Sequence, residues 1–229
     1  MYEPPPRPQP PQVRELSATM PGVYADLAPR YRPRVTRGLI ALLFAFYALQ
    51  VFVLDDANWL LLGALVQEGE WWRIVTGALM HAPPNSEFSV FHLLMNSYFG
   101  WLIGRSLEQH IGPWRMVLLS VVSMLGAGLA TTYMTPLEPT VGFSGVLYGW
   151  MGSWLGFHLT SRFPALKLRG EQMKAYRNTL LINLVLTFAV ASISWTGHLG
   201  GLVTGFAAAL VLGSGSARSR DGSSGASWA

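Results

Sequence analysis

The sequence predicts an all-α membrane protein, a bundle of six transmembrane helices. Hydrophobic residues make up 51% of the 229 residues and charged residues only 12%, about half the charged fraction that is usual in soluble domains. The apolar residues fall in runs suited to crossing about 30 Å of hydrocarbon, which takes roughly 17 to 25 helical residues. With six spans assumed, the basic residues also gather on one side of the membrane.

The six expected spans are runs of apolar residues that contain few charges. They lie near residues 38–54, 90–107, 114–134, 145–163, 178–193 and 198–212. The shorter runs fall below the ideal length, which suits inner helices that need not each contact the full lipid thickness.

The connection between the first two spans, residues 55–89, is long. It contains an apolar stretch, residues 59–66, followed by Trp71, Trp72 and Arg73. Tryptophan favours the headgroup level of the bilayer, where its apolar ring and its polar N–H are both satisfied. We therefore expect this connection to be a structured element that lies in the membrane interface.

The two ends of the chain have compositions that cannot build a core. Residues 1–37 are rich in proline and arginine and lack the features of a signal peptide. Residues 213–229 are rich in glycine and serine. We expect both to be disordered cytoplasmic tails that flank a membrane domain at residues 38–212.

The positions of the basic residues predict the orientation, because Lys and Arg near membrane segments stay cytoplasmic. Of the 16 Lys and Arg residues, only Arg73 falls on the outer side of the six-span arrangement. One span more or fewer would scatter these charges. We therefore expect both termini in the cytoplasm and a multi-pass protein of a prokaryotic cell membrane.

Polar residues at membrane depth are costly and need a reason. His92 and Asn96 stand four residues apart in the second span, hence on one face of a helix, and both can donate hydrogen bonds. They could form a polar clamp between helices, or they could stabilise a developing negative charge. The helix alone leaves both open.

Ser144 and His198 are the candidates for nucleophile and base. Ser144 follows a proline-containing loop at the start of the fourth span, where free backbone N–H groups favour an anion. Taken singly, Ser144 could be a helix cap and His198 a structural hydrogen bonder. However, a stripe of small residues begins at Gly145 and another at Gly197, and such stripes let two helices approach closely in lipid. If the stripes pack together, the serine and the histidine meet at similar depth.

Taken together, these motifs resemble the rhomboid family of intramembrane proteases. The matching residues are, in chain order, Trp72-Arg73, His92-Leu-Leu-Met-Asn96, Gly104 to Glu108, Gly142-Phe-Ser-Gly145 with Tyr148, and Gly197-His198-x-x-Gly201. Their order and spacing are far more specific than any single motif, and they cover the whole membrane domain. The stretch from His81 to Phe91 is longer than is usual in the family.

The resemblance implies a role for each matching residue. Ser144 would be the nucleophile and His198 its general base. The oxyanion hole would be formed by His92, Asn96 and the backbone N–H of Ser144, with Tyr148 packing against the base. The remaining matches are supporting or structural residues: Gly142, Gly145, Gly197, Gly201, Trp72, Arg73 and Glu108.

The expected activity is a serine endopeptidase that cleaves peptide bonds in or next to transmembrane segments by a Ser-His dyad. The spans from the fourth to the sixth lack acidic residues, and no spacing typical of a metal site occurs, so we expect neither a catalytic carboxylate nor a metal. The expected partners are transmembrane protein substrates and the lipid bilayer, without a cofactor or nucleic acid. The alternatives are a catalytically inactive relative that binds membrane proteins for trafficking, and a transporter or channel.

Overall fold

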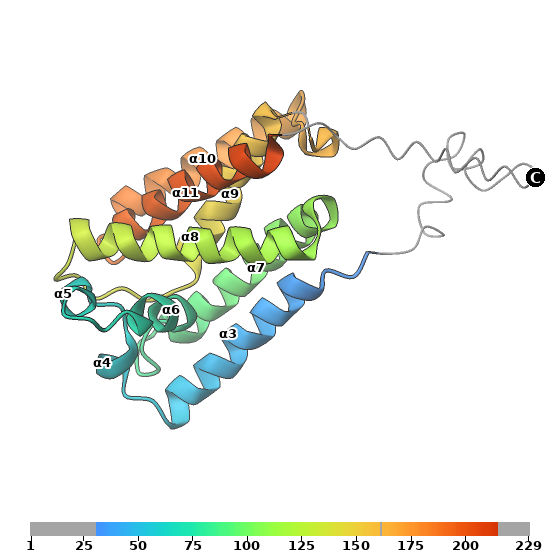
Figure 1. The fold of residues 1–229 in the computed structure, drawn as a ribbon. Coiled ribbons are helices and arrows are strands. Elements are labelled where there is room, and N and C mark those ends of the chain that lie inside the picture. Colours follow the sequence, from blue (N-terminus) through green and yellow to red (C-terminus); the bar gives the residue numbers. More distant parts are fainter. Residues whose placement is uncertain (1–30, 161, 215–229) are drawn as a thin grey trace, which may run out of the picture. The chain divides into compact units, whose positions relative to one another are not determined.

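The computed structural model of the protein describes residues 31–160 and 162–214. All the secondary-structure elements assigned in these ranges are helices (Figure 1). The all-α prediction is therefore confirmed for this part of the chain. The chain divides into two units after Arg32, and the helices described below belong to the second unit, which begins at Pro33. Most of the predicted tails, residues 1–30 and 215–229, lie outside the described residues. Residues 34–37, predicted as tail, are already helical.

Six of the described helices have 16 residues or more. They are α3 (Arg34–Phe52), α7 (Ser89–Ile111), α8 (Pro113–Met134), α9 (Ser144–Leu159), α10 (Glu171–Ala189) and α11 (Trp195–Gly213). Among the described residues, α3, α8 and α11 are long and apolar enough to cross a membrane by length and composition. These three helices support a helical membrane bundle.

Several predicted span boundaries differ from the helices, and the end of α9 and the start of α10 show why. The fourth span was expected to reach residue 163, but α9 ends at Leu159, and the short 3-10 helix η1 (Pro164–Leu166) follows. Proline disfavours helical geometry in the residue before it, so a helix tends to end ahead of it. Helix α10 begins at Glu171, seven residues before the predicted span, because a hydropathy window excludes polar helical turns such as the one with the Lys174–Glu171 ion pair.

The long first connection is structured, as expected. It contains three short helices, α4 (Asp56–Trp59), α5 (Gly63–Gln67) and α6 (Trp72–Leu79), which Figure 1 shows gathered at one end of the bundle. Arg73 of α6 is 4% exposed and forms an ion pair with Glu70. Its guanidinium also donates to the backbone carbonyls of Ala57 and Leu60, at 3.0 and 2.8 Å. Arg73 thus ties α6 to the end of α4.

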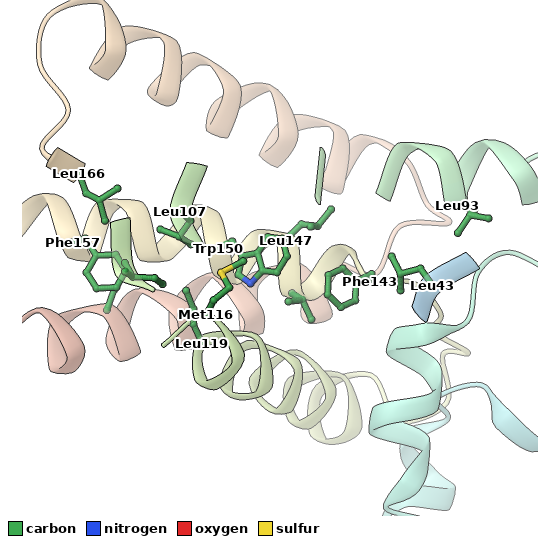
Figure 2. Packing of buried hydrophobic residues seen from close by; sticks show 13 residues of the cluster. Leu43, Leu93, Leu107, Met116, Leu119, Phe143, Leu147, Trp150, Phe157 and Leu166 are labelled. Carbon is green, nitrogen blue, oxygen red and sulfur yellow. The ribbon is translucent and has the colours of Figure 1, made fainter. Parts of the chain in front are cut away.

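The buried core is formed mainly by α7, α8 and α9, with Leu43 of α3 and Ala209 of α11 (Figure 2). Trp150 and Phe157 of α9 pack with Leu107 of α7 and Leu119 of α8, and all four are at most 1% exposed. The Trp150 indole N–H donates to the Ser120 hydroxyl at 3.2 Å, which satisfies its polar atom. Large apolar side chains remain exposed on the outer faces of the helices, as is expected where lipid replaces water.

Glu108, predicted as a structural carboxylate, caps the start of α3. Its carboxylate is fully buried and accepts hydrogen bonds from the Val35 N–H and from both the N–H and the hydroxyl of Thr36, at 2.8 to 3.1 Å. The first N–H groups of a helix have no acceptor within it, and the α3 cap residue Pro33 supplies none. A side chain from α7 therefore completes α3.

The stretch between α6 and α7 is held at both ends. The Gln50 side chain of α3 donates to the His81 carbonyl at 2.8 Å and accepts the His81 N–H at 3.1 Å. At the other end the Ser89 hydroxyl donates to the Ala82 carbonyl at 2.9 Å and lies 2.6 Å from the Tyr47 hydroxyl. Residues 83–88 between these anchors are exposed, apart from Ser86, which is half-buried.

Candidate active site

Ser144 is the first residue of α9, and the loop before it is fixed by backbone hydrogen bonds to the first connection. Leu61 and Thr140 exchange both of their N–H to carbonyl bonds, at 2.9 and 3.1 Å, and the Gly142 N–H donates to the Gly77 carbonyl at 2.9 Å. Gly142 has φ +119°, a conformation that side-chain-bearing residues rarely adopt, and it turns the chain into α9. The position of the Ser144 side chain is therefore set by its backbone.

His198 lies in the first turn of α11. The Ser194 hydroxyl accepts the Gly197 N–H at 3.2 Å and caps this helix. The His198 side chain is 7% exposed, and its Nε2 lies 2.8 Å from Oγ of Ser144. Two polar residues that are 54 positions apart in the chain are thus in direct hydrogen-bond contact.

The glycine stripes bring the two residues together. A Cβ placed on Gly201 would lie 1.9 Å from the Gly145 carbonyl oxygen, and one on Gly205 would lie 2.0 Å from the Gly149 carbonyl oxygen. A Cβ on Gly152 would lie 2.1 Å from the Leu202 carbonyl oxygen. The backbones of α9 and α11 therefore touch directly, and the prediction that the stripes pack together is confirmed.

Two side chains surround the His198 ring. Tyr148, one helical turn after Ser144, stacks on the imidazole with ring centroids 4.0 Å apart and an interplanar angle of 17°. The second nitrogen, Nδ1, lies 2.8 Å from the Thr187 hydroxyl of α10. Tyr148 was predicted at this place, whereas Thr187 was not.

His92 and Asn96 of α7 face the turn before Ser144. A Cβ on Gly142 would lie 2.8 Å from Nε2 of His92 and 3.8 Å from Nδ2 of Asn96. The Ala82 N–H donates to Nδ1 of His92 at 3.2 Å, so in a neutral ring the proton sits on Nε2, the nitrogen that faces the turn. One N–H of the Asn96 amide donates to the His92 carbonyl at 3.0 Å, which leaves its second N–H free to point elsewhere.

Several of the residues described above line a common cavity of about 360 Å³. Its lining includes Ser144, His198, His92, Asn96 and Thr187. The volume lies in the range of small-molecule sites.

The three remaining histidines, His81, His110 and His158, make no hydrogen bond to Ser144 or His198 in the described part of the chain. His81 is fully buried, with its ring centroid 5.1 Å from that of His92. Burial lowers the pKa of His81 to about 3, and the neighbouring His92 acts in the same direction. His110 and His158 bond to nearby backbone groups, at Ser106 and Leu168. Within the described ranges no group of three or more His, Cys, Asp or Glu residues could hold a metal ion.

Three further predicted residues, Trp72, Arg73 and Glu108, do not line the cavity that contains Ser144. Glu108 binds the start of α3, and Arg73 binds the first connection, as described above. The Trp72 ring, beside Arg73, is 51% exposed. Arg73 and Glu108 thus hold parts of the fold together, and the structural role of Trp72 stays a prediction.

Comparison with known proteins gives a consistent result. The family model of the Rhomboid domain matches residues 68–215. The chain is 32% identical over 150 residues to Rhomboid protease GluP of Bacillus subtilis (strain 168), covering 66% of this chain and 28% of that protein. It is 31% identical over 159 residues to RHOMBOID-like protein 6, mitochondrial, of Arabidopsis thaliana, covering 66% of this chain and 48% of that protein. The chain thus spans less than half the length of either relative.

Proposed function

Because the chain belongs to the rhomboid family, we propose that it is an intramembrane serine endopeptidase that cleaves peptide bonds in or next to transmembrane segments of membrane proteins. The observation that carries this proposal is the 2.8 Å separation of Ser144 Oγ and His198 Nε2. A hydroxyl within hydrogen-bond reach of a base is what nucleophilic acyl transfer requires. The similarity to a relative named as a rhomboid protease supports the same activity.

In the proposed mechanism Ser144 attacks the carbonyl carbon of the scissile bond while His198 Nε2 takes the hydroxyl proton. The imidazolium then gives this proton to the leaving amine, and the peptide C–N bond breaks to leave an acyl-enzyme. Water, activated by the same histidine, hydrolyses the ester and restores the serine. The dyad works without a carboxylate and without a cofactor.

Three donors would stabilise the oxyanion: His92 Nε2–H, the second N–H of the Asn96 amide, and the backbone N–H of Ser144. The bond from Ala82 to His92 Nδ1 supports the first of these, since it favours the ring form with Nε2 protonated. The third belongs to the first turn of α9, whose N–H groups lack acceptors within the helix. Such donors act on the charge that develops in the transition state.

We further propose that α3, α7, α8, α9, α10 and α11 all cross the membrane, with both termini in the cytoplasm of a prokaryotic cell. Helix α9 has 16 residues and is about 24 Å long at 1.5 Å per residue, but it is mostly buried by other helices. Single cysteines at Ser219 and Glu138 would test the orientation in this cysteine-free chain. Equal labelling of both from outside intact cells would contradict it.

Activity is tested with the full chain in liposomes and a generic transmembrane substrate. Wild type should cleave the substrate, and Ser144→Ala and His198→Ala should each abolish cleavage while remaining folded. A mechanism-based serine reagent should label wild type at Ser144 alone. A folded wild type without cleavage or labelling would instead support the inactive, membrane-protein-binding alternative.

A further inference from the structure

We infer that Thr187 of α10 is a positioning residue for His198: its hydroxyl accepts the Nδ1–H of the imidazole and holds the ring in the form whose Nε2 is free to take the serine proton. This inference rests on the proposed function, because it assigns a role within the same reaction. In the described part of the chain His198 makes no ion pair with a carboxylate. The orienting role that a carboxylate has in a triad would fall here to a neutral hydroxyl.

The first argument is the geometry of the ring. The Thr187 hydroxyl oxygen lies 2.8 Å from Nδ1, and the Ser144 hydroxyl oxygen lies 2.8 Å from Nε2. A neutral imidazole has one N–H and one bare nitrogen. If Nε2 is to accept the serine proton, Nδ1 must carry the hydrogen, and a buried N–H needs an acceptor. Thr187 is that acceptor.

The second argument is the number of hydrogens in the network behind the ring. Thr187 and Tyr148 both lie within hydrogen-bond distance of the Asn183 carbonyl, at 2.9 and 2.7 Å, and their hydroxyl oxygens lie 2.6 Å apart. With the contact to His198 this makes four polar contacts, served by two hydroxyl hydrogens and by one ring hydrogen when Nδ1 is protonated. When Nδ1 is protonated, three of the four contacts can be hydrogen bonds. When Nδ1 is bare, only the two hydroxyl hydrogens remain, and at most two of the four contacts can be hydrogen bonds.

The network therefore favours the ring form that the reaction needs. In this arrangement His198 donates to Thr187, Thr187 donates to Tyr148 or to the Asn183 carbonyl, and Tyr148 donates to the same carbonyl. The Asn183 carbonyl can only accept hydrogen bonds. It therefore favours the arrangement in which each hydrogen bond of this series points from His198 towards the carbonyl. Tyr148 then has two functions, since it also stacks on the imidazole.

The third argument is the position of Thr187 on its helix. It is the buried residue of α10, at 2% exposed, whereas neighbours such as Val185 and Phe188 are 66% and 61% exposed. A simpler role is a threonine that only bonds back to the carbonyl four residues earlier, which is common in helices. That role is satisfied by Asn183 alone and gives no reason for the hydroxyl to face Nδ1.

The two roles are separated by Thr187→Val, which keeps the volume and removes the hydroxyl, and by Thr187→Ser, which keeps the hydroxyl. The matched control is Thr132→Val on α8, a fully buried threonine that bonds back to the Gly128 carbonyl and does not line the cavity. The bond to the imidazolium of the transition state is charge-assisted, so Thr187→Val should lower kcat roughly 10- to 100-fold with KM little changed. Thr187→Ser should keep most of the activity, and the control should stay within about twofold of wild type, as expected for a change remote from the site.

A second measurement needs no variant. In wild type labelled with 15N-histidine, the His198 resonances report which ring nitrogen carries the proton, and we expect Nδ1 at a pH where the ring is neutral. Wild type with the proton on Nε2, or folded Thr187→Val with wild-type kcat, would overturn the inference. Ser144→Ala in the same assay distinguishes the two levels: if it still cleaves, the proposed function itself fails.

Discussion

Gly201→Ala tests whether direct contact of two backbones sets the distance between serine and histidine. The added Cβ would lie 1.9 Å from the Gly145 carbonyl oxygen, whereas real Cβ atoms essentially never come within 3.0 Å of a heavy atom outside their own and the adjoining residues. The helices must therefore separate by at least 1.1 Å (3.0 − 1.9) at this point. Because the obstacle is backbone, no side-chain rotation can relieve it.

The separation acts close to the dyad. Gly145 adjoins Ser144, and Gly201 lies one turn after His198, so most of the shift should reach the pair. If the whole 1.1 Å reached the pair, their 2.8 Å contact would lengthen to about 3.9 Å, beyond hydrogen-bond range. A misplacement of about 1 Å typically costs about 100-fold in rate. We expect a loss of that size in kcat/KM.

The assay is cleavage of a transmembrane substrate in liposomes, together with thermal unfolding of each variant. The matched control is Gly100→Ala in α7, where the nearest atom to the new Cβ is a flexible Leu147 methyl at 3.7 Å, an ordinary contact. Gly100→Ala should retain activity near wild type. A folded Gly201→Ala protein with at least half of the wild-type kcat/KM, or an equal loss in both variants, would refute the reasoning.

Three further changes address other parts of the protein. Asn96→Ala should slow cleavage about 100- to 1,000-fold if the amide stabilises the oxyanion, while thermal unfolding stays near wild type; a folded variant with full activity would return Asn96 to a structural role. Glu108→Gln places an amide where the carboxylate accepts the Thr36 N–H, so it should lower the free energy of unfolding by about 1 to 3 kcal/mol, and an unchanged unfolding midpoint would contradict the capping role. His81→Phe should flatten the loss of stability in acid: since the pKa of His81 is about 3 in the folded state and 6.5 in model compounds, the unfolded state binds more protons between these values. Each pH unit below 6.5 then costs the wild type up to about 1.4 kcal/mol, and equal slopes of unfolding midpoint against pH for both proteins would disprove this.

The pairing of Ser144 with His198 could be proposed from the sequence because glycine spacing carries spatial information. Two stripes that begin beside the two residues leave few ways to pack the helices. Tyr148 could be placed against the base by the family resemblance. The pairing depends on the spacing of small residues, which a sequence records directly.

Thr187 could not be predicted in the same way. A threonine in an apolar helix usually bonds back to its own helix, so its residue type carries no signal of a contact with another one. Its role depends on the rotation of α10 about its axis, which few buried residues constrain. The ends of α9 and α10 were misplaced for a different reason, since hydropathy reports apolar length and not where helical hydrogen bonding stops.

The anchoring of the stretch between α6 and α7 has a consequence for how this loop can vary. The Ala82 N–H donates to His92, and the Ala82 carbonyl accepts a hydrogen bond from the Ser89 hydroxyl. Residues 83–88 therefore form a loop whose two ends lie next to each other. Each doubling of such a loop costs only about 0.6 kcal/mol. Insertions or deletions there should leave the His92 ring where it is. The length of this segment is therefore compatible with the observed position of His92, and residues 83–88 are a suitable place to attach a label or an affinity tag.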